Sequence, residues 1–155
     1  MGATLIVMQA RTIPDETQLA AALRGAGMRL TAPRLAVLAE VWRQPHGDVD
    51  SIAIAARGKL GSVSTQAVYD VLRALTEADL VRRIEPAGSP ARFEARVGDN
   101  HHHIVCRYCA SIEDVDCAVG ERPCLEASDT HGYVIDEAEV TYWGVCPECA
   151  TAHPS

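Results

Sequence analysis

The chain has 155 residues, of which 48% are apolar and 23% charged, and this composition excludes disordered and low-complexity proteins. No apolar run approaches the roughly 20 residues of a membrane span and no signal peptide is recognisable, so a cytoplasmic protein with no membrane partner is predicted. The net charge of −7 does not exclude nucleic acid as a partner, because the acidic residues are concentrated in one part of the chain.

The charge divides the chain into two parts. Residues 1–92 carry 11 Lys and Arg against 9 Asp and Glu, a balance of +2, whereas residues 93–155 carry 3 against 12, a balance of −9. All six Cys and five of the six His fall in the second part. This asymmetry predicts two domains with different partners.

Two helices are predicted at the start of the first part, after a loose N-terminal segment over residues 1–16. The first covers residues 17–26. The second follows Thr31, a typical N-cap, has Pro33 in its first turn and stops at Pro45. Their predicted buried faces consist of Leu19 and Leu23, and of Leu35, Leu38, Val41 and Trp42.

Two further helices and a hairpin complete the first part. Asp48 is predicted to cap the third helix, and Ser64 the fourth, which runs to about residue 78. Their predicted buried faces are Ile52, Ala55, Ala56 and Leu60, and Val68, Val71, Leu72 and Leu75. Strands over residues 81–85 and 91–95, joined by a turn rich in Pro and Gly, then give the element order of a winged helix-turn-helix.

The second part is predicted to be a small α/β unit. Strands are expected over residues 104–106, 112–115 and 134–142, with a helix over residues 119–128 between the last two. Together with the winged helix-turn-helix, this predicts an α+β protein.

Four of the cysteines form two CxxC pairs, Cys106 with Cys109 and Cys146 with Cys149. Two such turns close a tetrahedral four-sulfur site, so a structural zinc ion is predicted to stabilise a module with a thin core. Two disulfides, which a cytoplasmic setting disfavours, and an iron ion are the alternatives. A thioredoxin-like redox pair is not expected, since neither CxxC is predicted to open a helix.

Cys117 and Cys124 are left over. Their spacing differs from that of a ligand turn, so they are either ordinary, partly buried cysteines, or redox candidates or an extra metal contact, and the sequence does not decide between these.

A histidine run precedes the first CxxC. On an extended strand His101 and His103 share one face, with His102 on the other. Together with Glu94 and Asp114, the first two would form a nitrogen and oxygen ligand set suited to Fe(II), Mn(II), Zn(II) or Co(II). The alternative for the histidine run is a solvated polar segment. His46 taken alone is predicted to be a surface loop residue.

These features together resemble the ferric uptake regulator superfamily of iron, peroxide and zinc sensors. The motifs that carry the resemblance are residues 30–34 (LTAPR), 63–69 (VSTQAVY), 92–94 (RFE), 101–109 (HHHIVCRYC) and 143–149 (WGVCPEC). Residues 116–125 (DCAVGERPCL) resemble the actinobacterial FurA/CatR branch, whose members typically repress a neighbouring catalase-peroxidase gene.

The resemblance implies a domain plan and metal sites. It implies a DNA-binding domain over residues 17–90, a hinge over 91–97 and a dimerisation and metal-binding domain over 98–155. The regulatory Fe(2+) or Mn(2+) ligands that it implies are His46, Glu94, His101, His103 and Asp114. Glu94 matches the iron sensors and Asp114 the peroxide sensors. His102 and Glu121 match part of a third site, but Asn100 and Ala138 replace its usual ligands unless Glu137 or Glu139 substitutes.

The fourth helix is predicted to be the recognition helix of a homodimer on an inverted-repeat, A·T-rich operator. Its polar N-terminal end is suited to base edges, and nearby arginines to phosphates. The predicted DNA-binding residues are Arg29, Arg34, Ser64, Thr65, Gln66, Tyr69 and Arg73, with Arg82 and Arg83 as further phosphate candidates. For each arginine the alternative is a solvated surface. Asp70 stands where the iron sensors often carry Arg.

The predicted function is a metal-dependent, peroxide-responsive repressor that is not an enzyme, with an iron sensor as the alternative. A metalloenzyme is disfavoured because no nucleophile is paired with a base and the four-cysteine site would be closed. A zinc-ribbon interaction module without DNA binding is disfavoured by the helix-turn-helix pattern.

Overall fold

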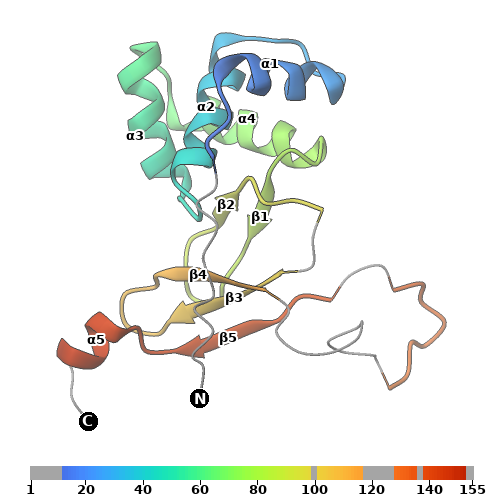
Figure 1. The fold of residues 1–155 in the computed structure, drawn as a ribbon, viewed down its shortest axis with the longest axis vertical. Coiled ribbons are helices and arrows are strands. Elements are labelled where there is room, and N and C mark those ends of the chain that lie inside the picture. Colours follow the sequence, from blue (N-terminus) through green and yellow to red (C-terminus); the bar gives the residue numbers. More distant parts are fainter. Residues whose placement is uncertain (1–11, 99–100, 117–127, 136–137, 153–155) are drawn as a thin grey trace, which may run out of the picture.

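The computed structural model describes residues 12–98, 101–116, 128–135 and 138–152. Four helices form one layer, a two-stranded wing projects from it, and a three-stranded sheet lies beyond the wing (Figure 1). No helix within these ranges is long and apolar enough to cross a membrane. The predicted α+β class is confirmed.

The helical layer consists of α1 (Glu16–Gly25), α2 (Ala32–Arg43), α3 (Val49–Leu60) and α4 (Thr65–Glu77). The predicted caps Thr31, Asp48 and Ser64 are confirmed, since each side chain accepts a hydrogen bond from a backbone N–H in the first turn. Asp15 and Gln18 form a reciprocal capping box on α1 that the sequence analysis missed.

The core of the layer surrounds α2, which contacts α1, α3, α4 and β2. Most of the predicted apolar positions are buried there. Leu35, Trp42, Ala55, Leu60 and Val71 are only half-buried. Val37 and Ala53, which were not predicted, are fully buried. A helix that has neighbours on several sides buries more than one face, which explains why Val37 of α2 is buried in addition to the predicted residues.

The wing consists of antiparallel strands β1 (Arg82–Ile84) and β2 (Arg92–Glu94), as predicted. The loop between α2 and α3 is attached to it, because Phe93 N donates to Gly47 O at 3.0 Å. Glu94, expected in the hinge, pairs with Arg82 of β1 and is therefore carried by the wing.

The second sheet has the order β4–β3–β5, with β3 (His101–Cys106) between antiparallel β4 (Ile112–Asp116) and parallel β5 (Thr141–Gly144). The predicted strand over residues 134–142 is wrong in its extent. Val134 is 96% exposed in a loop, and pairing with β3 begins only at Thr141. Apolar composition favours a strand, but a strand also needs a partner to complete its hydrogen bonds. The expected helix over residues 119–128 lies, apart from its last residue, outside the described residues.

Candidate metal centres and nucleic-acid interface

His46 occupies the loop between α2 and α3 in a left-handed backbone conformation, with φ 62°. Such a conformation is uncommon for a residue other than glycine and is maintained only where the surroundings fix it. Here Phe93 N donates a hydrogen bond to the carbonyl oxygen of the following residue, Gly47, and Arg92 Nη1 donates to His46 O at 3.5 Å. These hydrogen bonds hold the loop of His46 against β2, the strand that carries Glu94. The His46 side chain is only 10% exposed, so His46 is not a surface loop residue.

His101 and His103 lie on the same face of β3, as the strand periodicity predicts. His101 Nε2 lies 3.0 Å from Glu94 Oε1 and 3.7 Å from Asp114 Oδ1. His103 Nε2 lies 3.3 Å from Glu94 Oε2 and 3.7 Å from Asp114 Oδ1. Both rings are fully buried, so the interpretation as a solvated run is wrong.

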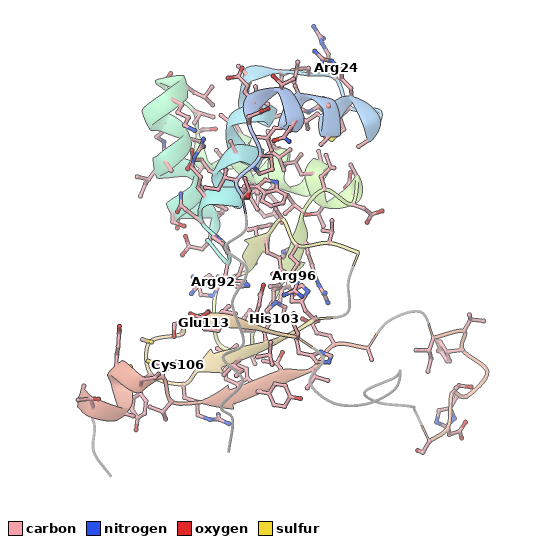
Figure 2. All side chains as sticks on the ribbon, viewed as in Figure 1. Arg24, Arg92, Arg96, His103, Cys106 and Glu113 are labelled. Atoms are coloured by element: carbon pink, nitrogen blue, oxygen red, sulfur yellow. The ribbon has the colours of Figure 1, made fainter. Side chains whose placement is uncertain are left out.

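His46 completes this group from the helical layer. Its Nε2 lies 3.1 Å from Glu94 Oε2 and 2.8 Å from Asp114 Oδ1. One ligand atom from each of His46, Glu94, His103 and Asp114 lies within 4.8 Å of the others. The structure thus brings together all five residues expected at the regulatory site, which we call the His/Glu/Asp cluster, between the wing and the three-stranded sheet (Figure 2).

The electrostatics of the His/Glu/Asp cluster suit a divalent cation. Burial would lower the pKa of His46, but hydrogen bonds with Asp114 and Glu94 outweigh it and raise the pKa to about 9. Burial would raise the pKa of Glu94, but hydrogen bonds with His103 and His46 lower it to about 2. The pKa of Asp114 is also lowered, since hydrogen bonds with His46 and Arg96 outweigh burial. Two ionised carboxylates among three imidazoles fit Fe(II), Mn(II) or Zn(II).

Arg96, which the sequence analysis did not single out, contacts the second oxygen of a cluster carboxylate. Its Nη1 lies 3.2 Å from Asp114 Oδ2, and its Nη2 lies 2.5 Å from Asp116 Oδ1. No local pattern marks this residue, because the contact joins positions 18 and 20 residues apart.

The third site is incomplete within the described residues. His102 lies on the opposite face of β3 from the cluster, with its ring 6.5 Å from that of Tyr142. Its ring nitrogens have no hydrogen-bond partner within the described ranges. Glu139 Oε1 lies 3.9 Å from His103 Nδ1 instead. Glu121 and Glu137, and the redox candidates Cys117 and Cys124, lie outside the described residues.

The four CxxC sulfurs lie within 4.8 Å of one another, with 3.7 Å between Cys109 Sγ and Cys146 Sγ. A tetrahedral zinc site with Zn–S bonds near 2.3 Å requires about 3.8 Å between sulfurs, so the arrangement fits. Hydrogen bonds from the backbone of Cys109 and Cys146 lower the pKa of Cys106 to about 6. Hydrogen bonding with Cys146 and burial raise the pKa of Cys149 to about 12. Four sulfurs this close need a cation to be ionised together.

One expectation about these turns is wrong, since the second CxxC does open a helix. Helix α5 (Pro147–Ala152) begins directly after Cys146. Pro147 is suited to the first helical position, where its missing N–H is not needed, and Glu148 lies favourably in the first turn. Cys106 lies on the side of the sheet close to α5 (Figure 2).

Most of the candidate DNA-binding residues lie at or near the start of α4 and α2, whereas Arg73 lies in the second half of α4. Gln66 is exposed and its Nε2 donates to Asp70 Oδ1 at 3.1 Å, and Tyr69 is 38% exposed. Ser64 Oγ accepts from Ala67 N, and Thr65 Oγ1 accepts from Arg57 Nη2 at 2.9 Å. These last two hydroxyls thus already have structural roles.

The candidate phosphate contacts differ in their surroundings. Arg73 is exposed, with Nη2 4.0 Å from Asp70 Oδ1. Arg34 Nη1 donates to Arg29 O at 2.8 Å, and this hydrogen bond fixes the Arg34 side chain beside the backbone of Arg29. On the wing, Arg83 is ion-paired with Glu85.

The sequence pattern of the ferric uptake regulator family matches residues 25–143. The transcriptional regulator FurA of Mycobacterium tuberculosis is 60% identical over 144 residues, covering 93% of this chain and 96% of that protein. Ferric uptake regulation protein 1 of Mycolicibacterium fortuitum is 61% identical over 121 residues, covering 78% and 75%. The peroxide operon regulator of Bacillus subtilis is 30% identical over 129 residues, covering 83% and 88%.

Two regulators of known structure have the same fold. The peroxide stress regulator of Campylobacter jejuni has a TM-score of 0.61 and 25% identity, with 86% of this chain and 97% of that chain covered. The ferric uptake regulator Fur of Helicobacter pylori has a TM-score of 0.66 and 17% identity, with 90% and 96% covered, and supports the fold alone.

Proposed function

The chain belongs to the ferric uptake regulator family, and we propose that within it this protein is a peroxide-responsive repressor. Like the other members of this family, it is a metal-dependent transcriptional regulator and not an enzyme. The proposal assigns Zn(2+) to the four cysteines as a structural ion and Fe(2+) or Mn(2+) to the His/Glu/Asp cluster as the regulatory ion.

The single observation that carries the proposal is the contact of His46 with Asp114. The helical layer supplies His46, the wing supplies Glu94, and the three-stranded sheet supplies His101, His103 and Asp114. An ion bound by all five residues joins the two halves of the chain. It therefore has higher affinity for this arrangement than for one in which the halves have separated, and such a difference is what a population shift requires. A change from 1:99 to 99:1 needs about 5.5 kcal/mol.

In the proposed mechanism, residues 98–155 form a homodimer and residues 17–90 bind DNA. Closure around the His/Glu/Asp cluster sets the two α4 helices for successive major grooves, about one helical turn apart, on an inverted repeat. Gln66 is suited to adenine and Tyr69 to neighbouring bases, which favours an A·T-rich operator. Arg29, Arg34 and Arg73 are assigned to phosphates.

Peroxide is favoured as the signal by two arguments. The family resemblance implies that the peroxide sensors carry Asp where this chain has Asp114, and the similar proteins include a peroxide operon regulator and a peroxide stress regulator. Fe(II) in the cluster would supply the electron that reduces hydrogen peroxide beside its ligands. His46 and His103 are the imidazoles assigned to be oxidised, and loss of either weakens the connection between the halves and releases DNA.

A plain iron sensor is the second candidate. It is favoured by Glu94, which matches the iron sensors, and by the relatives named ferric uptake regulation proteins. In an alternative route for the redox signal, DNA would be released without Fe(II) by oxidation of Cys117, Cys124 or the zinc thiolates. A neighbouring catalase-peroxidase gene is the proposed target in all cases.

Fluorescence anisotropy of operator DNA tests these candidates. The zinc-loaded protein would be loaded with Mn(II) or Fe(II) without oxygen, bound to duplex selected from a random library, and given a brief, low dose of hydrogen peroxide. Release from the Fe(II) form alone is the expected result. Release from both forms would transfer the signal to cysteine chemistry. Release from neither, with binding that simply follows the Fe(II) concentration, would indicate an iron sensor. Binding of DNA from upstream of a catalase-peroxidase gene tests the target separately.

A further inference from the structure

Arg96 connects the segment after the wing to strand β4. It stands two residues beyond Glu94, and its guanidinium spans two carboxylates, with Nη1 3.2 Å from Asp114 Oδ2 and Nη2 2.5 Å from Asp116 Oδ1. Asp114 and Asp116 are two residues apart on one strand and so share a face, which matches the fork of a guanidinium. The Arg96 side chain is 17% exposed and that of Asp114 25%, so this pair is largely shielded from water, whereas Asp116 is 79% exposed and anchors the guanidinium from the surface.

The two oxygens of Asp114 consequently have different surroundings. Oδ1 faces the imidazoles, 2.8 Å from His46 Nε2 and 3.7 Å from the Nε2 atoms of His101 and His103. Oδ2 faces Arg96.

Glu94 shows no such division. Its Oε1 lies 3.0 Å from His101 Nε2, and its Oε2 lies 3.1 Å from His46 Nε2 and 3.3 Å from His103 Nε2. Both oxygens of Glu94 therefore face imidazoles, whereas among the described residues the imidazole contacts of Asp114 are made by Oδ1.

We propose that Arg96 is a positioning residue that turns the Asp114 carboxylate so that only Oδ1 is offered to a metal ion in the His/Glu/Asp cluster. The inference rests on the proposed function in so far as that function places a divalent ion among these residues. The terminal torsion of an aspartate is soft, so a free carboxylate would rotate and could present both oxygens. A guanidinium fixed between two carboxylates removes this freedom, and partners that hydrogen-bond to metal ligands typically change metal affinity 10–100-fold.

Two other effects of Arg96 predict different outcomes on substitution. If only its positive charge mattered, its removal would strengthen the binding of a cation, and replacement by lysine would change nothing. If Arg96 only tied two segments together, substitution would lower thermal stability and leave the metal environment unchanged. Positioning depends on the planar fork, which lysine lacks, so Arg96→Lys separates it from both.

Mn(II) binding to the full-length, zinc-loaded protein, followed by electron paramagnetic resonance, is the test. We expect Arg96→Lys and Arg96→Gln to weaken Mn(II) binding about tenfold and to alter the spectrum of the bound ion, because the oxygen donors change. Asp116→Asn, which weakens the anchor and not the ligand, is expected to produce a smaller change in the same direction. Arg83→Lys is the matched control, since it alters an arginine–carboxylate pair on the wing, and it should leave both readouts unchanged.

An Arg96→Lys protein with the affinity and spectrum of the wild type would overturn the inference. So would tighter binding in Arg96→Gln alone, or a lower melting temperature with an unchanged spectrum. The measurement uses neither DNA nor peroxide. A wild type that binds Mn(II) and shows the Arg96 effects, but does not bind operator or respond to peroxide, would refute the proposed function and leave this inference standing.

Discussion

His46→Ala is predicted to uncouple metal binding from DNA binding without unfolding either half of the chain. The imidazole reaches Asp114 and Glu94 at 2.8 and 3.1 Å. The loop itself is held by the hydrogen bond of Phe93 N with Gly47 O, which does not involve the side chain. His46→Asn provides a second variant, because asparagine tolerates a positive φ better than alanine does.

The expected losses of metal affinity and of metal-dependent DNA affinity in His46→Ala follow from the number of ligands that remain and from the half of the chain to which each belongs. Loss of a residue that only orients a ligand costs about 10–100-fold in metal affinity, and His46 is assigned as a ligand itself, so we expect about 100-fold, or about 2.8 kcal/mol. Glu94 would remain as the ligand on the side of the wing. Couplings between two sites typically amount to 5–150-fold, and we expect the gain in operator affinity caused by Mn(II) to fall below about threefold.

The proton on His46 gives a second readout. Because the two carboxylates outweigh burial and hold the pKa of His46 at about 9, Mn(II) must displace a proton from the imidazolium at neutral pH. The proton competes below the pKa and not above it, so the Mn(II) affinity of the wild type should rise with pH up to about 9. His46→Ala should show a shallower rise.

Calorimetric titration with Mn(II), with and without the selected duplex, measures both effects. Coupling is reciprocal, so in the wild type DNA must raise Mn(II) affinity by the factor by which Mn(II) raises DNA affinity. His131→Ala is the matched control, since its imidazole is 78% exposed and pairs with Asp129 in a loop. Light scattering should show an intact dimer in each variant. A His46→Ala protein with the wild-type gain in operator affinity would refute the assignment of His46.

Three further predictions concern other parts of the chain. Cys106→Ser should remove zinc and unfold or monomerise the second half, because structural zinc contributes about 10–16 kcal/mol in small zinc modules; a dimer that keeps its zinc by elemental analysis would contradict the four-cysteine assignment. Arg73→Ala should weaken operator binding and reduce its slope against salt concentration by about one unit, whereas Arg24→Ala on α1 should not, and equal slopes in anisotropy titrations would remove Arg73 from the interface. Glu40→Gln should lower the free energy of unfolding by about 1–2 kcal/mol at pH 7, since Glu40 is buried and accepts from Lys59 at 2.8 Å and Arg43 at 2.9 Å. Although burial raises the pKa of Glu40, its hydrogen bond with Lys59 helps to lower it below 4.5, so this contribution is present above about pH 4.5 and is lost as the pH falls through the lower value. Urea unfolding curves of the two proteins should therefore converge in acid, and a constant difference would contradict the argument.

The features that the sequence predicted well depend on local chemistry. Thr31 and Ser64 mark helix starts because a hydroxyl bonds a backbone N–H three residues away, and the alternation of His101 and His103 follows from strand geometry. The CxxC spacing likewise reports the shape of a turn.

The features that it missed depend on distant partners. The start of β5 at Thr141 depends on how far β3 extends, and the contact of Arg96 with Asp114 depends on the path of the chain after the wing. His46 lies between these cases, because its loop gives no sign of a ligand and only the family resemblance indicated its role. Its contact with Asp114 joins residues 68 positions apart, which periodicity and spacing cannot detect.

The division of the cluster between the two halves gives the two histidines different consequences when they are oxidised. His46 and Glu94 are joined to one body, since the loop of His46 is hydrogen-bonded to β2 through Gly47 and Phe93. The three-stranded sheet supplies the other ligands. In the proposed mechanism, oxidation of His103 leaves two ligands on each side, so the connection is weakened but not removed. Oxidation of His46 leaves Glu94 alone on the side of the helical layer, and this is the lesion that most directly separates metal binding from the position of α4.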